Sequence, residues 1–347
     1  MVDTVALKNR MMEVAEQYLG QGKKMGDHLS YACPFVAEKT PGAFCVYEDH
    51  YFCYSCGASG DVIKFVQQMD RVDFREACRR LGAGETDNEA IEAWRQKREA
   101  ERAAEEVERQ KMRQSYHDSG KWKEYHLALD SASRERWRKW GIPDSFQNWW
   151  KLGYTPDRTY STDNGLAHSE AFVMPMWSFP NGVPSHVLTS QFRLTNPAPG
   201  AGRFRFEMGL GTAAFITRND WKSGETDHTP YRCLVVEGPR KAATVRCAKG
   251  IDANLQIVGV PSKLDTGGIL EALKRFEWVF VWLDPDVRFP PKNAPSNWEP
   301  ADVKLCKAIG GSSSYVRFGY KIDDAILAGQ LDGSQIQRML MQAERVL

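Results

Sequence analysis

The chain has 347 residues, of which 42% are hydrophobic and 26% are charged. These fractions are typical of globular proteins, so a mostly disordered chain is excluded. The formal net charge of +1 excludes a bulk positive field, and any site for a polyanion must therefore be a local patch. At about 150 residues per domain, the length predicts roughly two globular units and a small third one.

No segment of the sequence has the pattern of a membrane-inserted helix. The longest apolar runs, such as 278–283, are far shorter than the roughly 20 residues of a membrane-spanning helix. The amino end lacks the basic stretch and following apolar stretch of a secretion signal. We therefore expect a cytoplasmic protein that has no membrane partner.

Residues 1–84 are predicted to form a first unit that contains a cysteine cluster. Helical spacing of apolar residues covers 5–19, strand-like runs follow around Tyr31 and over 44–52, and a second helix starts near Asp61. Four cysteines of this unit fall within 24 residues, which favours a metal site, whereas the other four of the chain lie among apolar neighbours and are expected to be core thiols. The clustered set is Cys33, Cys45, Cys53 and Cys56, and the scattered set is Cys78, Cys233, Cys247 and Cys306.

Residues 85–118 are predicted to form a charged helical linker. Glutamates alternate with lysines and arginines from 89 to 114, with no glycine or proline. This pattern indicates a solvent-exposed helix with salt bridges along its surface. Its role is either that of a spacer or that of a binding surface for another protein.

Residues 119–230 are predicted to start with tryptophan-rich helices and to continue with strands. Two apolar runs, 172–179 and 187–194, are separated by a segment that contains Asn181-Gly182. Asn-Gly between two such runs indicates a β-hairpin, because the favoured turn needs positive φ angles.

Residues 231–330 alternate between strands and helices, which predicts a parallel sheet covered on both faces. A carboxy-terminal helix over 331–347 completes a multidomain α+β and α/β chain. The predicted strands are 233–236, 256–260, 278–283 and 315–318, and the predicted helices start near Lys241 and cover 267–276, 301–309 and 334–347.

The sequence Cys53-x-x-Cys56-Gly57 has the spacing of a zinc knuckle. Two thiolates three residues apart in a tight turn can bind one Zn²⁺ from the same side, and the glycine permits the chain reversal. Cys33-Pro34 is expected to form the opposite knuckle, which predicts a zinc ribbon.

This region resembles the zinc-binding domain of bacterial and phage DNA primases. The shared motifs are C-P-F from Cys33, E-K-T-P from Glu38 and C-x-x-C-G-x-x-G-D from Cys53. In that family a histidine three residues after the first cysteine is a ligand, but Val36 stands there in this sequence. We expect Cys45 to replace it, and the alternatives are His28, His50 or a water molecule.

Acidic residues follow two of the predicted parallel strands. Glu237 ends the first strand, and Asp284 and Asp286 follow a later one. The carboxyl ends of neighbouring parallel strands meet at one edge of the sheet, where ligands bind. Carboxylate oxygens are the ligands that Mg²⁺ prefers, so this edge is predicted to hold a divalent cation.

These motifs resemble the Toprim domain that primases, topoisomerases and some nucleases share. The resemblance implies that Glu237 is catalytic and that Asp284 and Asp286 hold Mg²⁺ or Mn²⁺. The form E-G-x-x-K-A, with Lys241, is closer to phage and plasmid primases, and Asp324 matches a later acidic position. The resemblance makes Lys241 and Asp324 further candidates for cofactor binding.

Basic residues alternate with phenylalanine between the two motif regions. Arg193 lies in one predicted strand, and Arg203 and Arg205 alternate with Phe204 and Phe206. Such alternation is typical of a strand with one buried and one cationic face. The primase resemblance implies that all three arginines line a groove facing the acids and contact phosphate. A simple solvated strand face is the alternative.

Together, the two resemblances imply a DNA primase of phage or mobile-element type. It would make short RNA primers from ribonucleoside triphosphates on single-stranded DNA. Glu237 would act as a general base or metal ligand, the zinc ribbon would contact the template through Tyr51, Phe52 and Tyr54, and a separate helicase is a plausible partner. The alternatives are a Mg²⁺-dependent Toprim nuclease and a non-catalytic zinc-ribbon factor that binds DNA in replication or defence.

Overall fold

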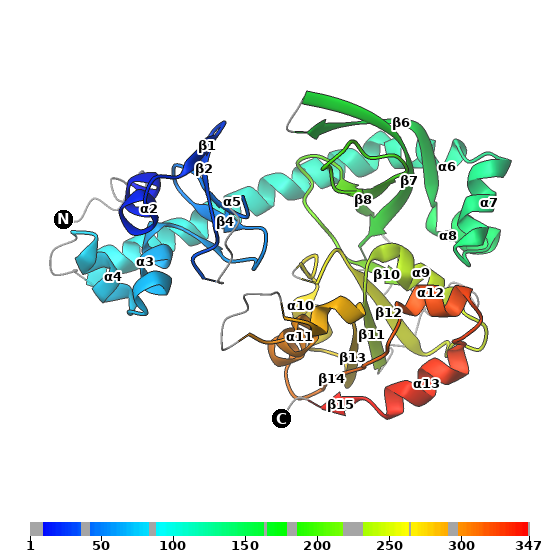
Figure 1. The fold of residues 1–347 in the computed structure, drawn as a ribbon. Helices are drawn as coiled ribbons and strands as arrows, with labels where there is room; N and C mark the ends of the chain where they lie inside the picture. The colour runs from blue at the N-terminus through cyan, green and yellow to red at the C-terminus, as the bar shows by residue number, and fades with distance from the viewer. Residues whose placement is uncertain are drawn as a thin grey trace. The chain divides into compact units, whose positions relative to one another are not determined.

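The computed structural model describes residues 10–35, 42–82, 88–162, 165–178, 186–217, 232–263, 265–290 and 298–345 (Figure 1). The chain divides into two compact units. The first contains Met1–Glu105 and Pro290–Trp298, and the second contains Glu106–Phe289 and Glu299–Leu347. None of the helices in the described part is both long and apolar enough to cross a membrane.

The first unit is built on a five-stranded antiparallel sheet in the order β1-β2-β3-β4-β5. Alternate side chains of its strands point to opposite faces, and one face carries the core of the unit. The strands are β1 (Lys23–Met25), β2 (His28–Tyr31), β3 (Phe44–Val46), β4 (Tyr51–Cys53) and β5 (Ser59–Gly60).

Three helices pack against the core face of this sheet: α2 (Met11–Leu19), α3 (Val62–Asp70) and α4 (Phe74–Arg80). The predicted helix over 5–19 is described from Met11, and the earlier residues lie outside the described ones. The second predicted helix is confirmed as α3. It begins after Asp61, because the Asp61 side chain accepts a hydrogen bond from the Lys64 N–H and caps the helix.

The charged segment forms one long helix, α5 (Asn88–Ser119), as predicted. Its last turns belong to the second unit, where Arg113 donates hydrogen bonds to the carbonyl oxygens of Leu210 and Thr212. The Tyr116 hydroxyl lies 2.8 Å from the Ser190 hydroxyl, so the end of α5 is anchored by buried polar contacts.

The second unit contains two sheets. The first is antiparallel in the order β6-β7-β8-β9, and the predicted hairpin is confirmed as the pair β7 and β8, although its Asn181-Gly182 turn lies outside the described residues. The strands are β6 (Gly153–Thr162), β7 (Gly165–Trp177), β8 (Val187–Leu194) and β9 (Phe204–Phe206), preceded by α6 (Lys121–Leu127), α7 (Ser131–Lys139) and α8 (Asp144–Trp150).

The second sheet has the order β10-β12-β11-β13-β14-β15. Its four central strands are parallel, as predicted, and the strands at its two edges are antiparallel to their neighbours. The strands are β10 (Phe215–Thr217), β11 (Arg232–Glu237), β12 (Leu255–Val260), β13 (Trp278–Trp282), β14 (Ser313–Tyr315) and β15 (Glu344–Arg345).

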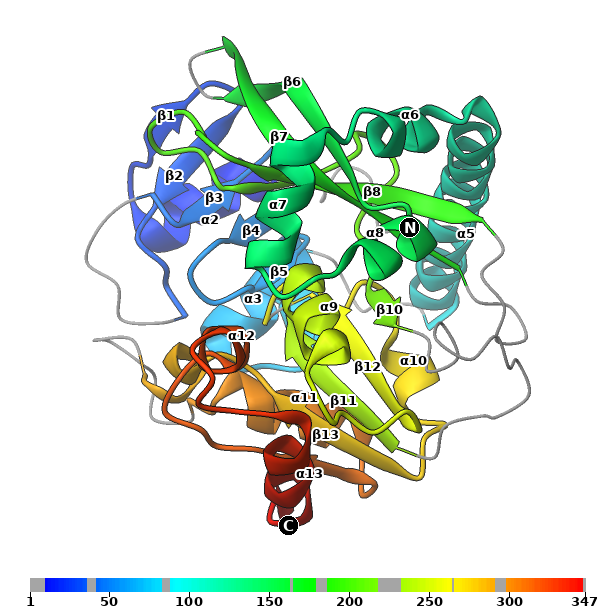
Figure 2. The same cartoon turned by 90° about the vertical axis from the view of Figure 1, so that its right-hand side faces the viewer.

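Helices cover both faces of this parallel sheet, as the alternating pattern predicts. The helices α9 (Pro239–Cys247), α12 (Ile322–Leu327) and α13 (Gly333–Met341) share one core with the antiparallel sheet. On the other face lie α10 (Leu270–Leu273) and α11 (Ala301–Ile309). Figure 2 shows α9 lying along β11 and β12, below α7 and β7.

Two predicted helices are shorter than expected. The helix predicted over 267–276 is reduced to α10, because Gly267 and Gly268 adopt positive φ angles that a helix excludes. The carboxy-terminal helix ends at Met341, and β15 then pairs with β14.

Candidate functional site

Three cysteine thiols of the first unit converge. The sulfur atoms of Cys33, Cys53 and Cys56 all lie within 4.8 Å of one another, and those of Cys33 and Cys56 are 3.6 Å apart. Zinc–sulfur bonds of about 2.3 Å in a tetrahedral site separate two sulfurs by roughly 3.8 Å, so this spacing fits one Zn²⁺. Three of the four donors of a structural zinc site are therefore in place.

The knuckle turn explains why Cys53 and Cys56 point the same way. The Gly57 N–H donates to the Cys53 carbonyl and the Cys53 N–H donates to the Ala58 carbonyl, both at 2.8 Å. Gly57 has a φ of 74°, which a residue with a Cβ rarely adopts. The contact with Cys33, together with burial, raises the pKa of the Cys56 thiol, and a bound cation would offset this by stabilising the thiolate.

The structure does not bring Cys45 into this group, contrary to the sequence-based expectation. Phe44 pairs with Cys53 across β3 and β4, and directly paired residues share one face of a sheet. Cys45 therefore lies on the opposite face, paired with Phe52, and its thiol is 3.9 Å from the Gly42 carbonyl oxygen. Alternation along β3 excludes it as a ligand in this fold.

The alternative histidines also lie outside the cysteine group. The rings of His28 and His50 both contact Tyr47, with centroids at 5.1 and 4.6 Å, and their Nδ1 atoms contact Asp27 and Asp49. No fourth ligand is present among the residues that the structure describes, and Val36 lies outside them.

Only part of the predicted aromatic template surface is accessible. Tyr51 is fully buried in the core of the first unit, and its hydroxyl donates to Gln68 at 2.6 Å. Tyr54 is 66% exposed and its ring packs edge-on against Phe52. Tyr51 is therefore a core residue, and the prediction that it contacts DNA is wrong.

In the second unit, the three predicted acids lie together. Glu237 ends β11, and Asp284 and Asp286 follow β13, the strand that pairs with β11 in parallel. One carboxylate oxygen from each residue lies within 4.8 Å of the other two. The carboxyl ends of two adjacent parallel strands thus place three negative charges at one edge of the sheet.

Three lysines face these acids from three different elements. Lys241 in the first turn of α9 donates to Asp284, and Lys321 lies 3.3 Å from the second oxygen of the same carboxylate. Lys263, which follows β12, donates to Asp286 at 3.0 Å. Lys241, which the resemblance makes a candidate for cofactor binding, therefore lies beside the acids.

Glu237 differs from the other two acids, because none of the described lysines forms an ion pair with it. Its Oε2 atom is buried and has no hydrogen-bond partner in the described structure. Burial and the charge of Asp284 raise the pKa of Glu237. Burial also acts to raise the pKa of Asp286, but the hydrogen bond and charge of Lys263, a backbone hydrogen bond and the charge of Lys321 together lower it. A carboxylate with one buried, unpartnered oxygen beside two other carboxylates is a donor set that fits Mg²⁺ or Mn²⁺.

The predicted arginines do not all share one face. Arg193 pairs with Phe172 and Phe204, and its side chain lies on the face of β8 that packs toward the parallel sheet. Arg205 pairs with Phe192 and lies 5.5 Å from the centroid of Tyr160, on the opposite face.

The structure therefore contradicts the prediction that Arg205 faces the acids. Arg205 pairs with Phe192, the residue next to Arg193 on β8. Because consecutive residues of a strand point to opposite faces, Arg205 and Arg193 lie on opposite faces of the sheet. Arg203 is exposed just before β9, close enough to Arg193 for its charge to lower the pKa of Arg193.

Asp324 is exposed and is not part of the acidic group, although the resemblance makes it a candidate. Its neighbour Asp323 is the buried residue of the pair, and it forms an ion pair with Arg240 of α9. Successive residues at the start of α12 point in different directions, so Asp323 is buried while the next residue, Asp324, is exposed.

The sequence-based prediction missed several charged residues near the acids. Lys263 follows the carboxyl end of β12, so the edge rule that found the acids would have found it as well. Arg240 and Arg136 gave no comparable signal, because their convergence depends on the packing of α7 against α9 and β8.

Comparisons with known proteins identify the first unit most directly. Residues 1–97 match the family model described as CHC2 zinc finger. A DNA primase from Thermotoga maritima is 38% identical over 82 residues, which are 23% of this chain and 14% of that protein. A DNA primase from Geobacillus stearothermophilus is 29% identical over 181 residues, or 48% of this chain and 28% of that protein.

Solved primase structures align over longer stretches at low identity. The zinc-binding and RNA polymerase domains of the Aquifex aeolicus primase align with a TM-score of 0.45 and 15% identity, covering all of this chain and 87% of that one. The DnaG primase catalytic domain bound to single-stranded DNA aligns with a TM-score of 0.47 and 12% identity, covering 69% and 83%.

The matched segments cover less than a third of the length of either bacterial relative. Within the first unit, the family match, the knuckle motif and the three convergent thiols agree with one another. Residues 1–97 therefore match the CHC2 zinc finger family model, and in this unit the chain is similar to bacterial DNA primases.

Proposed function

We propose that this chain is a DNA primase that joins ribonucleoside triphosphates into short RNA primers on a single-stranded DNA template. The observation that carries the proposal is the pairing of a primase-family zinc ribbon with three carboxylates at the end of a parallel sheet. Zinc held by thiolates stabilises a fold, whereas clustered carboxylates hold a hard cation that assists phosphoryl chemistry.

The carboxylates and lysines have complementary tasks in this proposal. Glu237, Asp284 and Asp286 would hold Mg²⁺ or Mn²⁺, which when bound supplies positive charge to the transferring phosphoryl group. As an alternative to holding the metal, Glu237 would accept the proton of a primer 3′-hydroxyl as a general base. Lys263 and Lys321 would neutralise phosphate oxygens beside the acids.

The zinc ribbon would contact the template through its outer face. Tyr54 is exposed there, next to Phe52, and unpaired bases stack on exposed aromatic rings. A phage or mobile-element origin belongs to the same proposal on the resemblance of the E-G-x-x-K-A motif, and a separate helicase partner belongs to it on the resemblance to primases.

A primer-synthesis assay tests the proposal. The purified chain is incubated with Mg²⁺, labelled ribonucleoside triphosphates and single-stranded templates of random sequence, with the template ends labelled in a second colour. We expect short labelled RNA and intact template. Shortened template without RNA would instead identify a nuclease, and binding without either product would identify a non-catalytic DNA-binding factor.

A further inference from the structure

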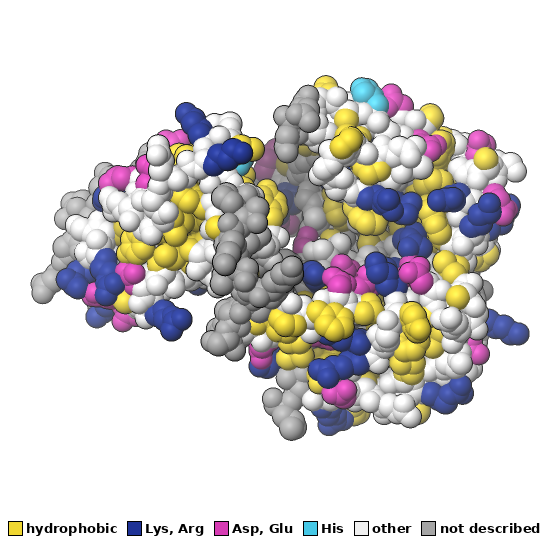
Figure 3. Space-filling view, in the orientation of Figure 1, with side chains coloured by type: hydrophobic (Ala, Val, Ile, Leu, Met, Phe, Trp, Pro, Cys, Tyr) yellow, Lys and Arg dark blue, Asp and Glu magenta, His cyan; other side chains and the backbone are white. Residues whose placement is uncertain are grey.

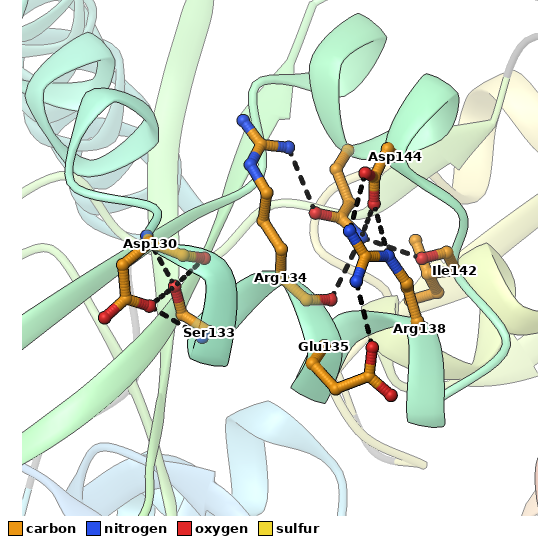
Figure 4. Close-up of polar contacts among 8 residues, drawn as sticks. Asp130, Ser133, Arg134, Glu135, Arg138, Ile142 and Asp144 are labelled. Atoms are coloured by element: carbon orange, nitrogen blue, oxygen red, sulfur yellow. Dashed lines mark hydrogen bonds and ion pairs between the residues drawn. The ribbon is translucent and has the colours of Figure 1, made fainter.

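The polar cluster between α7 and α8 shows how side chains satisfy one another without a ligand. The Asp130 carboxylate accepts a hydrogen bond of 2.7 Å from the Ser133 N–H (Figure 4). Arg138 forms ion pairs with both Glu135 and Asp144. The three thiols of the first unit differ from such a cluster, because a tetrahedral zinc ion takes four donors and these residues bring three. The identity of the fourth donor therefore decides what this zinc site can do.

No further cysteine or histidine joins the three thiols among the described residues. Cys45 lies on the opposite face of the sheet, and Cys78 is buried in α4, outside the group. His28 and His50 contact Tyr47 and their neighbouring aspartates instead. The other cysteines and histidines of the chain all follow residue 116, in the second unit. The described residues thus offer this zinc no fourth sulfur or nitrogen atom.

The charge of the group favours a neutral fourth donor. Three thiolates carry one negative charge more than Zn²⁺ neutralises, and an added carboxylate would double that excess beside Cys33 and Cys53, which are 4% and 0% exposed. Burying unpaired charge is costly, so water is a better fourth ligand than a carboxylate such as that of Glu38, which lies outside the described residues. The Ser55 hydroxyl is already a hydrogen-bond partner of the Cys53 sulfur, at 3.1 Å.

The edge of the thiol group is accessible and apolar. Cys56 is partly exposed, whereas the other two cysteines are buried. Phe35 and Ala58, each two residues from one of the ligands, are partly buried and pack against the core of the first unit. Figure 3 shows hydrophobic side chains gathered on the visible surface of this unit, with Lys and Arg side chains toward its margins. A ligand that approaches beside Cys56 therefore meets apolar side chains, which suit an uncharged aromatic base.

We propose that the zinc ion of this chain is held by Cys33, Cys53 and Cys56 with a water molecule as its fourth ligand, and that a neutral nitrogen base can replace this water. Zinc sites with three protein ligands hold water or an incoming molecule in the fourth position. The ligand class is imidazole, the side-chain base of histidine, because it binds zinc through nitrogen and adds no charge. The inference concerns the metal alone and does not rest on primase activity.

Cobalt substitution tests the fourth position by absorption spectroscopy. The full chain is freed of zinc and reloaded with Co²⁺, and the thiolate-to-cobalt charge-transfer band shows that the metal lies among the cysteines. Imidazole and acetate are then added in separate titrations while the visible d–d bands of Co²⁺ are recorded. Cys56→Ser should lose most of the charge-transfer band, which separates this site from the carboxylates of the second unit.

Val36→His supplies a fourth ligand within the chain. Residue 36 has the same spacing from Cys33 as Cys56 has from Cys53, and two ligands with this spacing can bind one zinc ion from the same side. Val36→Ala is the matched control, because it changes the same residue without adding a donor. Glu38→Gln removes the carboxylate rival while keeping the size of the side chain.

We expect imidazole to shift the d–d bands of the wild type and of Val36→Ala until about one imidazole is bound per Co²⁺, whereas acetate should leave the bands unchanged. Val36→His should show the shifted bands without any addition and should not respond to imidazole. Glu38→Gln should have the spectrum and the imidazole response of the wild type.

If the wild-type bands do not respond to imidazole, or if Glu38→Gln alone changes them, the chain itself provides the fourth ligand and the inference is wrong. A response to acetate as large as the response to imidazole would also overturn it, because the site would then not prefer a neutral base. The proposed primase function fails separately: absent primer synthesis in Mg²⁺ would contradict that function and would leave these spectra unaffected.

Discussion

At the scale of single residues, the zinc site depends on which cysteines share a face. Sequence spacing could identify Cys53 and Cys56 because both lie in one local turn. It could not decide about Cys45, because that decision depends on the register of β3 against β4. Only the pairing of strands shows that Cys45 faces away from the other three thiols.

We predict that Cys45→Ser keeps the zinc and that Cys56→Ser loses most of it. A serine hydroxyl is a poor replacement for a thiolate ligand, but Cys45 lies on the opposite face of the sheet. Elemental analysis of the purified proteins should give about one zinc per chain for the wild type and for Cys45→Ser. A chain with Cys45→Ser that lacks zinc would return Cys45 to the ligand set.

A second prediction at this scale concerns the unpartnered carboxylate. Glu237→Gln removes the charge of the one acid that no lysine pairs with, so the site should bind Mn²⁺ more weakly. The electron paramagnetic resonance signal of free Mn²⁺ measures this binding directly. Glu271→Gln, at an exposed glutamate, is the matched control. Equal Mn²⁺ binding by the two variants would remove Glu237 from the site.

At the scale of elements, the start of α9 positions both Lys241 and Arg240, and it lies unusually close to β12. A Cβ atom built on Gly259 would be 2.7 Å from the Pro239 Cα and 2.8 Å from the Gly238 carbonyl oxygen. Both are backbone atoms, which cannot move aside as a flexible side chain can. The first turn of α9 therefore requires a glycine at this position of β12.

We predict that Gly259→Ala destabilises the second unit by about 1–3 kcal/mol, the usual cost of overpacking a close contact. It should also weaken Mn²⁺ binding, because α9 must shift away from the strand ends. Urea unfolding measures the first effect. Gly319→Ala is the control, since a Cβ atom there meets nothing within 4 Å. Equal unfolding midpoints for the two variants would contradict this account of α9.

The elements also show which parts of the fold could be read from sequence. The alternation of strands and helices predicted the parallel sheet, and the edge rule then placed Glu237, Asp284 and Asp286 together. The alternation of arginine and phenylalanine did not predict the direction of Arg205, because alternation along a strand fixes which residues share a face but not which face meets the next sheet.

At the scale of the whole molecule, what sequence could not show is convergence across distant segments. Trp140 meets Arg193 and Arg240 only because α7, β8 and α9 share one core, and no local pattern around any of the three predicts this. For the same reason, the sequence could not distinguish the environments of Asp284 and Asp286. Asp284 is buried between two lysines, whereas Asp286 is exposed.

Because of this difference in burial, Asp286 is the better position at which to test the role of the three carboxylates. Asp284→Asn would leave two lysines facing a neutral, buried amide, so lost activity could reflect local misfolding. Asp286→Asn removes a charge from an exposed carboxylate and should leave the fold unchanged. Asp324→Asn makes the same substitution at an exposed aspartate outside the acidic group, and it is the matched control.

The most direct measurement compares primer yield with single-stranded DNA affinity on the same preparations of the wild type, Asp286→Asn and Asp324→Asn. We predict that Asp286→Asn lowers primer yield roughly 100-fold or more, because a misplaced metal loses several kcal/mol of charge stabilisation. Its affinity for DNA should be equal to or greater than that of the wild type, and Asp324→Asn should retain both properties. Full primer synthesis by Asp286→Asn would contradict the assignment of catalysis to the three carboxylates.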